Sequence, residues 1–252
     1  MGGSGRLVAV LLALLWPALP AAAQETCAAP ASLTVTARPM PHLAAALRPN
    51  GQVDVLALGS ASLLGTRGGS AGSIPDRMIA ALQAAVPNAH LRLTLRAGRA
   101  ESAAEMLVSL RRELAVRPYQ LVLWQTGTVE ALRQEPPAQF RATLADGIAA
   151  ATGQGADLVL IDMQFSRLLR RHAELQPYRA AMTEAALQPG VMLLPRFALM
   201  RAWAQDGTID LEAAARADRR RTVQRLRECL GDVLARMLLQ SAGQTQAVGQ
   251  TQ

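Results

Sequence analysis

The sequence predicts a doubly wound α/β sandwich, and two observations lead to that prediction. The first is the stretch 53–58, in which five of six residues are apolar; it lies between Asn50-Gly51 and Gly59, as expected of a strand buried on both faces. The second is that strand-like and helix-like segments alternate along the rest of the chain. This alternation is typical of a parallel sheet covered by helices on both sides.

The element after the first strand begins at Ser73. Serine is a favoured N-terminal cap and Pro75 suits the first turn, so a helix is expected over 73–85, ending before Pro87. The alternating residues 90–95 then predict a second strand, with His90 as a surface residue at its start.

The remaining elements continue the same alternation. Residues 102–116 predict a helix, because its apolar residues recur at spacings of three and four; these are Ala103, Met106, Leu107, Leu110 and Leu114. Strands are expected at 119–125, 156–162 and 191–194, and helices at 137–152, around Pro177 and at 209–240. Gly153 and Gly155 end the helix at 137–152.

The N-terminal residues 1–23 have the pattern of a secretory signal peptide. Arg6 precedes the apolar block 7–15, and Ala21 to Ala23 form a cleavage site of small residues. An uncleaved anchor is the alternative, but the block is shorter than the roughly 20 residues of a membrane-spanning helix, and no later segment approaches that length. We therefore expect a periplasmic or secreted protein. The mature chain divides into an irregular, proline-containing arm at 24–50, one domain at 51–240, and a polar, disordered tail at 241–252.

The cysteines and the charge are consistent with export. An even pair in an exported chain predicts a disulfide between Cys27 and Cys229, with two separately buried thiols as the alternative. All 26 basic residues are arginine, and the formal net charge is +7. Anionic glycans or a membrane surface are plausible neighbours of such a chain. With 3% aromatic residues and no recognition motif, nucleic acid is not an expected partner, and no cofactor or metal is predicted.

Polar residues follow several of the predicted strands. Ligands of α/β proteins bind beyond the carboxyl ends of the strands, which places Ser60 and Ser62 where chemistry usually occurs. The alternative for both serines is turn and helix-cap chemistry. Gln125, Asp162 and Gln164 end other strands, and either line the cleft or cap the next segment; Trp124 is either a core residue or a sugar platform.

Four stretches together resemble the SGNH, or GDSL, hydrolase family. They are 57–63, similar to the first block; 101–107, similar to the helix after the second block; 121–128, similar to the third block; and 218–221, at the place of the D-x-x-H motif. The resemblance covers essentially the whole mature chain. It implies a flavodoxin-like, five-stranded parallel sheet in a three-layer αβα sandwich and, in a working member, hydrolysis of esters such as acetyl groups on surface polysaccharides.

The chain departs from the family pattern at the residues that carry the chemistry. By the resemblance, the serine nucleophile falls on Ala61, the oxyanion asparagine on Val129, and the histidine base on Arg221. An arginine stays protonated and cannot act as a base. The second-block glycine falls on Ala100, or on Gly98 if the alignment shifts, and only Asp218 matches the triad.

The sequence therefore predicts an exported, catalytically degenerate hydrolase whose cleft binds a carbohydrate or acyl ligand. The binding residues expected are Gly59, Gln125, Gly127, Thr128, Asp162 and Arg221. The arginine-rich run 216–221 is either a solvated helix face or an anionic subsite. One alternative is an active esterase or deacetylase using Ser60 or Ser62, with Asp218 and with His172 as base. The other is an envelope scaffold that binds partner proteins.

Overall fold

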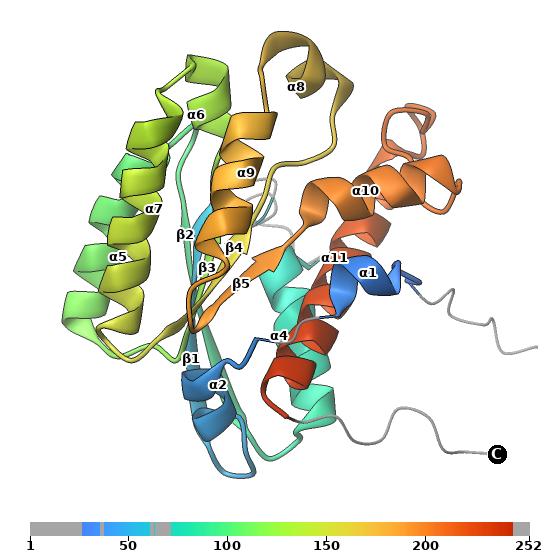
Figure 1. Cartoon of the computed structure of the whole chain (residues 1–252). Coiled ribbons are helices and arrows are strands. Elements are labelled where there is room, and N and C mark those ends of the chain that lie inside the picture. Colours follow the sequence, from blue (N-terminus) through green and yellow to red (C-terminus); the bar gives the residue numbers. More distant parts are fainter. Residues whose placement is uncertain (1–26, 36–37, 61–62, 64–71, 244–252) are drawn as a thin grey trace, which may run out of the picture.

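The fold is a five-stranded parallel sheet between two layers of helices (Figure 1). A computed structural model describes residues 27–35, 38–60, 63 and 72–243. The strand order is β2-β1-β3-β4-β5. The order reverses after β2, so the predicted doubly wound topology is confirmed. The strands are β1 (Gln52–Gly59), β2 (His90–Ala97), β3 (Leu121–Gln125), β4 (Asp157–Ile161) and β5 (Val191–Leu194).

One face of the sheet packs on α4 (Ile74–Ala85) and α11 (Arg219–Ser241), which lie against each other. The other face packs on α5 (Ala103–Val116), α7 (Pro137–Thr152) and α9 (Gln176–Ala185). Alternate residues of each central strand enter the two cores: in β1, Val55 and Ala57 face α4 and α11, whereas Leu56 and Leu58 face α5. This two-sided burial explains why the central strands are continuous apolar runs.

The helix starts predicted at Ser73 and Ser102 are confirmed. The Ser73 hydroxyl accepts a hydrogen bond from the Asp76 backbone N–H at the start of α4, and the Asp76 carboxylate accepts from the Ser73 N–H. Ser102 and Glu105 form the same reciprocal cap at the start of α5. The five apolar residues predicted to share one face of α5 are all buried.

Two segments differ from the sequence prediction. The arm is not irregular throughout, because it contains α1 (Ala31–Thr34) and α2 (Pro41–Ala46), and Met40, Leu43 and Leu47 are fully buried. The predicted helix at 209–240 begins only at Arg219. The carboxylate of Asp210 accepts hydrogen bonds from the N–H groups of Glu212 and Ala213, and this local turn replaces the first turns of the expected helix.

Three further helices follow β3, β4 and β5 and were not predicted. They are α6 (Thr128–Arg133), α8 (Arg167–His172) and α10 (Arg196–Gln205). The signal peptide 1–23 and tail residues 244–252 lie outside the described residues. No helix in the described part of the chain is both long enough and apolar enough to cross a bilayer.

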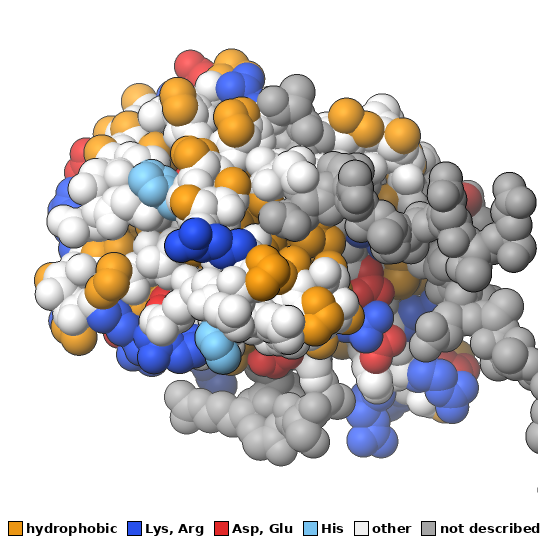
Figure 2. Space-filling model, turned by 90° about the horizontal axis from the view of Figure 1, so that it is seen from below, with side chains coloured by type: hydrophobic (Ala, Val, Ile, Leu, Met, Phe, Trp, Pro, Cys, Tyr) orange, Lys and Arg blue, Asp and Glu red, His pale blue; other side chains and the backbone are white. Residues whose placement is uncertain are grey.

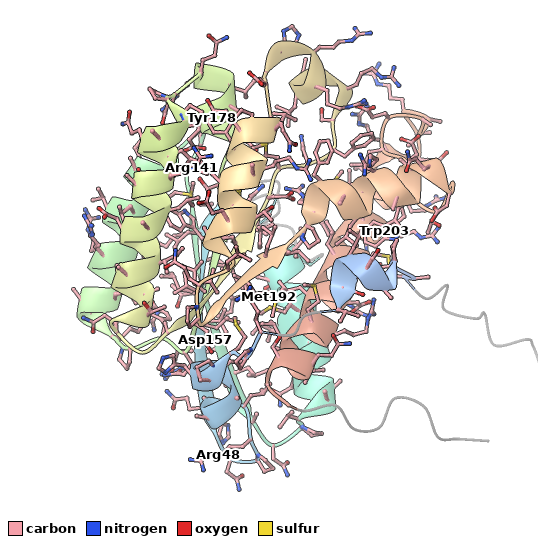
Figure 3. All side chains as sticks on the ribbon, in the orientation of Figure 1. Arg48, Arg141, Asp157, Tyr178, Met192 and Trp203 are labelled. Atoms are coloured by element: carbon pink, nitrogen blue, oxygen red, sulfur yellow. A yellow bond between two sulfur atoms is a disulfide. The ribbon has the colours of Figure 1, made fainter. Side chains whose placement is uncertain are left out.

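The predicted disulfide between Cys27 and Cys229 is present, and it joins the N-terminal segment to α11. Trp203 of α10 donates its indole N–H to the Ala28 carbonyl at 2.7 Å, and Arg236 of α11 donates to the Cys27 carbonyl at 3.1 Å. Figure 3 shows Trp203 beside α1. The arm is thus held to α10 and α11 by the disulfide and by these two hydrogen bonds, and the Met40 N–H also donates to the Ser241 carbonyl of α11 at 3.4 Å.

Candidate functional site at the carboxyl edge of the sheet

All five strands are parallel, so their carboxyl ends share one edge, and the loops to α4, α6, α8 and α10 leave from it (Figure 1). We call this the carboxyl edge. The predicted site residues that follow β1, β3 and β4 belong to it, as the sequence indicated.

Ser60 lies where β1 ends, and its hydroxyl is bonded to an amide. The side-chain oxygen of Gln125, at the end of β3, accepts hydrogen bonds from the Ser60 N–H at 3.2 Å and from the Ser60 hydroxyl at 3.1 Å. A Cβ on Gly59 would lie 2.9 Å from that same oxygen, so the contact needs a glycine there. Gln125 therefore fixes the end of β1 against β3. Ala61 and Ser62 lie outside the described residues.

The turn after β3 is organised by Glu130, which the sequence analysis missed. Gly127 has a φ of 91°, a conformation that glycine adopts easily. The buried carboxylate of Glu130 accepts hydrogen bonds from the Gly127 N–H at 2.8 Å and from the Ala103 N–H at the start of α5. Burial raises the pKa of Glu130 above its ordinary value. Thr128 and Val129 begin α6 and are half-buried, and the Val129 side chain offers no donor to an oxyanion.

The loop after β2 holds an unusual backbone conformation. Ala100 has a φ of 54°, in the left-handed region that favours glycine. Its carbonyl accepts a hydrogen bond from Arg133 at 2.9 Å. This conformation fits the alignment in which Ala100, rather than Gly98, stands where the resemblance implies a glycine.

Asp218 and Arg221 form an ion pair that is exposed to solvent. Asp218 directly precedes α11, and Arg221 lies in the first turn. Their closest charged atoms are 3.6 Å apart, with side chains that are 55% and 87% exposed. Such a pair contributes little to stability. Neither side chain makes a hydrogen bond to Ser60 in the described residues.

No histidine is hydrogen-bonded to Ser60 among the residues that the structure describes. Of the three histidines in the chain, His42 in α2 and His90 at the start of β2 lie at the opposite edge. Figure 2 views that side and shows histidine side chains on the surface. His172 ends α8 with an exposed side chain, and no hydrogen bond among the described residues joins it to Ser60. In the part of the chain that the structure describes, Ser60 is thus not hydrogen-bonded to His172 or Asp218, and the second candidate of the esterase alternative, Ser62, lies outside it.

Asp162, after β4, is a buried anchor. Its carboxylate accepts a hydrogen bond from the Phe197 N–H at 2.8 Å, and the Arg179 guanidinium lies 3.3 Å away. Burial raises the pKa of Asp162 to about 6, although the N–H of Phe197 and the charge of Arg179 act in the opposite direction. Burial also lowers the pKa of Arg196 to about 10, an effect that the charge of Asp162 opposes. Asp162 thus ties the starts of α9 and α10 to the sheet.

The raised pKa of Asp162 predicts that the free energy of unfolding depends on pH. The ordinary value is 3.8 and the folded value is about 6, so the folded protein binds the proton more tightly than the unfolded chain. The stabilising contribution is complete below about pH 4 and is lost as the pH rises through about 6, with a total of up to about 3 kcal/mol. Urea unfolding of the wild type and Asp162→Asn from pH 4 to 7 measures it. The stability difference, wild type minus variant, should fall across this range, and a constant difference would refute the assignment.

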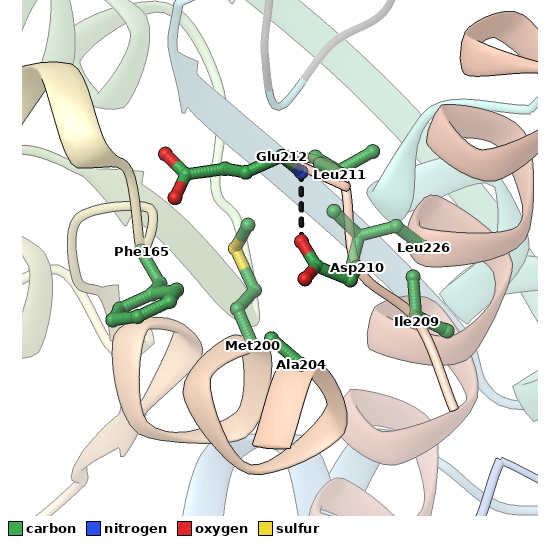
Figure 4. Close-up of a pocket in the computed structure, with 8 residues that line it drawn as sticks. All are labelled: Phe165, Met200, Ala204, Ile209, Asp210, Leu211, Glu212 and Leu226. Carbon is green, nitrogen blue, oxygen red and sulfur yellow. Dashed lines mark hydrogen bonds between the residues drawn. The ribbon is translucent and has the colours of Figure 1, made fainter. Parts of the chain in front are cut away.

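A cavity of about 250 Å³ opens beside this anchor, between the start of α4, the loop after β4, the start of α10, residues 211–212 and α11. Its polar lining includes Gln164, Glu212, Arg196, Arg219 and Arg227. A neighbouring hollow of about 10 Å³ shares Phe165, Leu211, Glu212 and Leu226 with it (Figure 4). The small hollow has room for at most one water molecule. The larger cavity, in contrast, has room for a small organic ligand.

Comparison with known proteins identifies the family. Residues 26–244 match the model of the Non-GDSL lipase-like family, and the chain belongs to that family. No curated protein matches the chain. The fold is that of SGNH hydrolases.

Three solved structures illustrate that likeness of fold. TesA matches with a TM-score of 0.53 and 20% identity, over 71% of this chain and 99% of that one. A catalytic mutant of Axe2, an acetylxylan esterase from Geobacillus stearothermophilus, matches with a TM-score of 0.57 and 16% identity, over 76% and 94%. AlinE4, an SGNH-hydrolase family esterase, matches with a TM-score of 0.51 and 17% identity, over 65% and 86%.

Proposed function

We propose that this chain is an exported member of its family that has lost serine-histidine ester hydrolysis and instead binds a carbohydrate or acyl ligand at the carboxyl edge. The observation that carries the proposal is the environment of Ser60, whose hydroxyl is bonded to the amide oxygen of Gln125 at 3.1 Å. An amide oxygen does not take up the proton that an attacking serine must lose. Ser60 therefore holds a turn in place.

The loss extends to each part of the catalytic unit. The positions that the resemblance assigns to nucleophile, oxyanion donor and base hold Ala61, Val129 and Arg221. A triad works as a unit, so losing one member removes roughly three to six orders of magnitude in rate and losing the others removes little more. The acetylxylan esterase described as a catalytic mutant carries a serine-to-alanine change and keeps its similarity to this chain, which supports the view that the fold persists without the nucleophile.

A binding role is supported by what the carboxyl edge retains. The edge keeps a cavity of about 250 Å³ lined by arginines, and Gln125, Glu130 and Asp162 hold the surrounding loops by hydrogen bonds. Export is supported by the signal-like residues 1–23 and by the disulfide, since disulfides persist in oxidising compartments. The partner-binding alternative has no comparable feature in its favour.

The proposal predicts that the chain carries no activated serine. The purified mature protein should not be labelled by a fluorophosphonate probe, which modifies the nucleophile of serine hydrolases. An active serine esterase serves as the positive control, and intact-mass spectrometry as the readout. Stoichiometric adduct formation that is abolished in Ser60→Ala or in Ser62→Ala would overturn the proposal and identify the nucleophile.

A further inference from the structure

The lining of the cavity at the carboxyl edge combines arginines with apolar side chains. The arginines are Arg196, Arg219 and Arg227. The apolar residues come from α4, the loop after β4, residue 211 and α11; they are Ile74, Phe165, Leu211, Val223, Leu226 and Leu230. A cavity of this kind matches a ligand that has a charged end and an apolar body.

The charged residues that line the cavity carry more positive than negative charge. The acidic residue of the lining, Glu212, is already paired with Arg167 and Arg170, each at 3.5 Å. Within the ranges that the structure describes, no acidic side chain pairs with Arg219 or Arg227. The charge of Arg227 also acts on the buried guanidinium of Arg196 and lowers its pKa, because two like charges lie near each other. A bound anion would relieve this repulsion.

The volume of the cavity and its apolar lining residues restrict the size and the polarity of the uncharged part of the ligand. Benzene fits an apolar cavity of about 150 Å³, so about 250 Å³ suits a ligand of about ten non-hydrogen atoms. A sugar ring needs hydrogen-bond partners around it, whereas six of the residues that line this cavity are apolar. The apolar lining residues thus favour an aliphatic chain over a carbohydrate.

We propose that this cavity binds an amphiphilic anion, a carboxylate or phosphate group on a medium-length aliphatic chain, with Arg219 and Arg227 holding the charged group. The proposal rests on the proposed function and narrows its ligand from carbohydrate or acyl to an anionic acyl compound. Such a ligand differs from the ester expected as the substrate of a working hydrolase, because a carboxylic ester group is neutral and cannot form an ion pair with these arginines.

Isothermal titration calorimetry on the mature protein tests the proposal. Octanoate and octyl phosphate are the two anionic probes, and octan-1-ol is the neutral probe of similar length. We expect either or both anions to bind at one site, with an affinity at least tenfold above that of the alcohol, and we expect 0.5 M NaCl to weaken binding. The stronger of the two anions identifies the headgroup.

The variants separate the cavity from the general positive charge. Arg227→Met and Arg219→Met should each weaken binding of the anion roughly tenfold, since each removes a charge-assisted contact. Arg220→Met is the matched control, because it removes the same charge from the same exposed helix start but from a residue that does not line the cavity. Its affinity should stay within about twofold of the wild type. Circular dichroism checks that each variant is folded.

Several outcomes would overturn the proposal: no binding of either anion, equal binding of octan-1-ol, equal losses in Arg220→Met and Arg227→Met, or tighter binding of glucuronate than of octanoate. Its failure is distinguishable from failure of the proposed function. The titration needs no catalysis, whereas the loss of the serine nucleophile is tested separately by probe labelling, whose result does not depend on whether an anion binds.

Discussion

Loss of the Cys27–Cys229 disulfide is expected to destabilise the protein by about 3 to 5 kcal/mol. The bond closes a loop with a sequence separation of 202 residues, and the chain-entropy model gives the largest effects for long loops because the unfolded chain gains the most freedom. For a chain of this size, such a loss lowers the melting temperature by about 10 °C. The Cys27→Ser, Cys229→Ser double variant should show this shift in differential scanning calorimetry.

Reductant provides the control for this prediction. Dithiothreitol should lower the melting temperature of the wild type toward that of the double variant and should leave the variant unchanged. If the double variant melted within about 2 °C of the oxidised wild type, the disulfide would not stabilise the arm as described. The hydrogen bonds that Ala28, Cys27 and Ser241 accept would then be enough to hold the arm.

Replacement of Asp162 by alanine is expected to cost about 1 to 3 kcal/mol at pH 7. The carboxylate faces the Arg179 guanidinium at 3.3 Å, offsets the charge of the buried Arg196 and accepts the Phe197 N–H. Removing it leaves the buried Phe197 N–H without this acceptor, while the penalty of burying the ionised carboxylate, which raises its pKa, is relieved and keeps the net loss in this range. Urea unfolding at pH 7, followed by circular dichroism, measures it.

Asp162→Asn is the matched variant, because an amide oxygen can still accept the Phe197 N–H. We expect it to be less destabilising at pH 7 than alanine, because only the charge is lost. The surface variant Asp218→Ala serves as a control, since its ion pair with Arg221 is exposed; its effect should stay below about 1 kcal/mol. An effect of Asp162→Ala as small as that of Asp218→Ala would contradict the role given to Asp162.

The strands and the capped helices were predictable from sequence, because local patterns determine them. The run at 53–58 is buried on both faces, and Ser73 and Ser102 cap the helices that were placed after them. The errors occur where tertiary contacts or side-chain turns override a pattern. The turn made by Asp210 interrupts what looked like one helix, and α2 forms in a proline-containing arm because Leu43 is buried and its N–H bonds to Asp157 at 2.8 Å. Figure 3 shows Asp157 beside α2.

The site was predicted in part. The sequence placed Ser60, Gln125 and Asp162 at one edge of the sheet, and the disulfide pairing followed from the cysteine count. Glu130 was missed, although its position three residues after Gly127 is the spacing of a capping box. The charge repulsion between Arg196 and Arg227 could not have been predicted, because it depends on how α10 and α11 pack across the sheet edge.

The central claim is that this chain does not hydrolyse esters by a serine-histidine mechanism. Hydrolysis of a short-chain aryl acetate by the purified mature protein tests that claim most directly, with the Ser60→Ala, Ser62→Ala double variant assayed beside it. We predict rates indistinguishable from the buffer rate for both proteins. Turnover well above the buffer rate in the wild type that disappears in the double variant would contradict the account and place a working nucleophile beside Ala61.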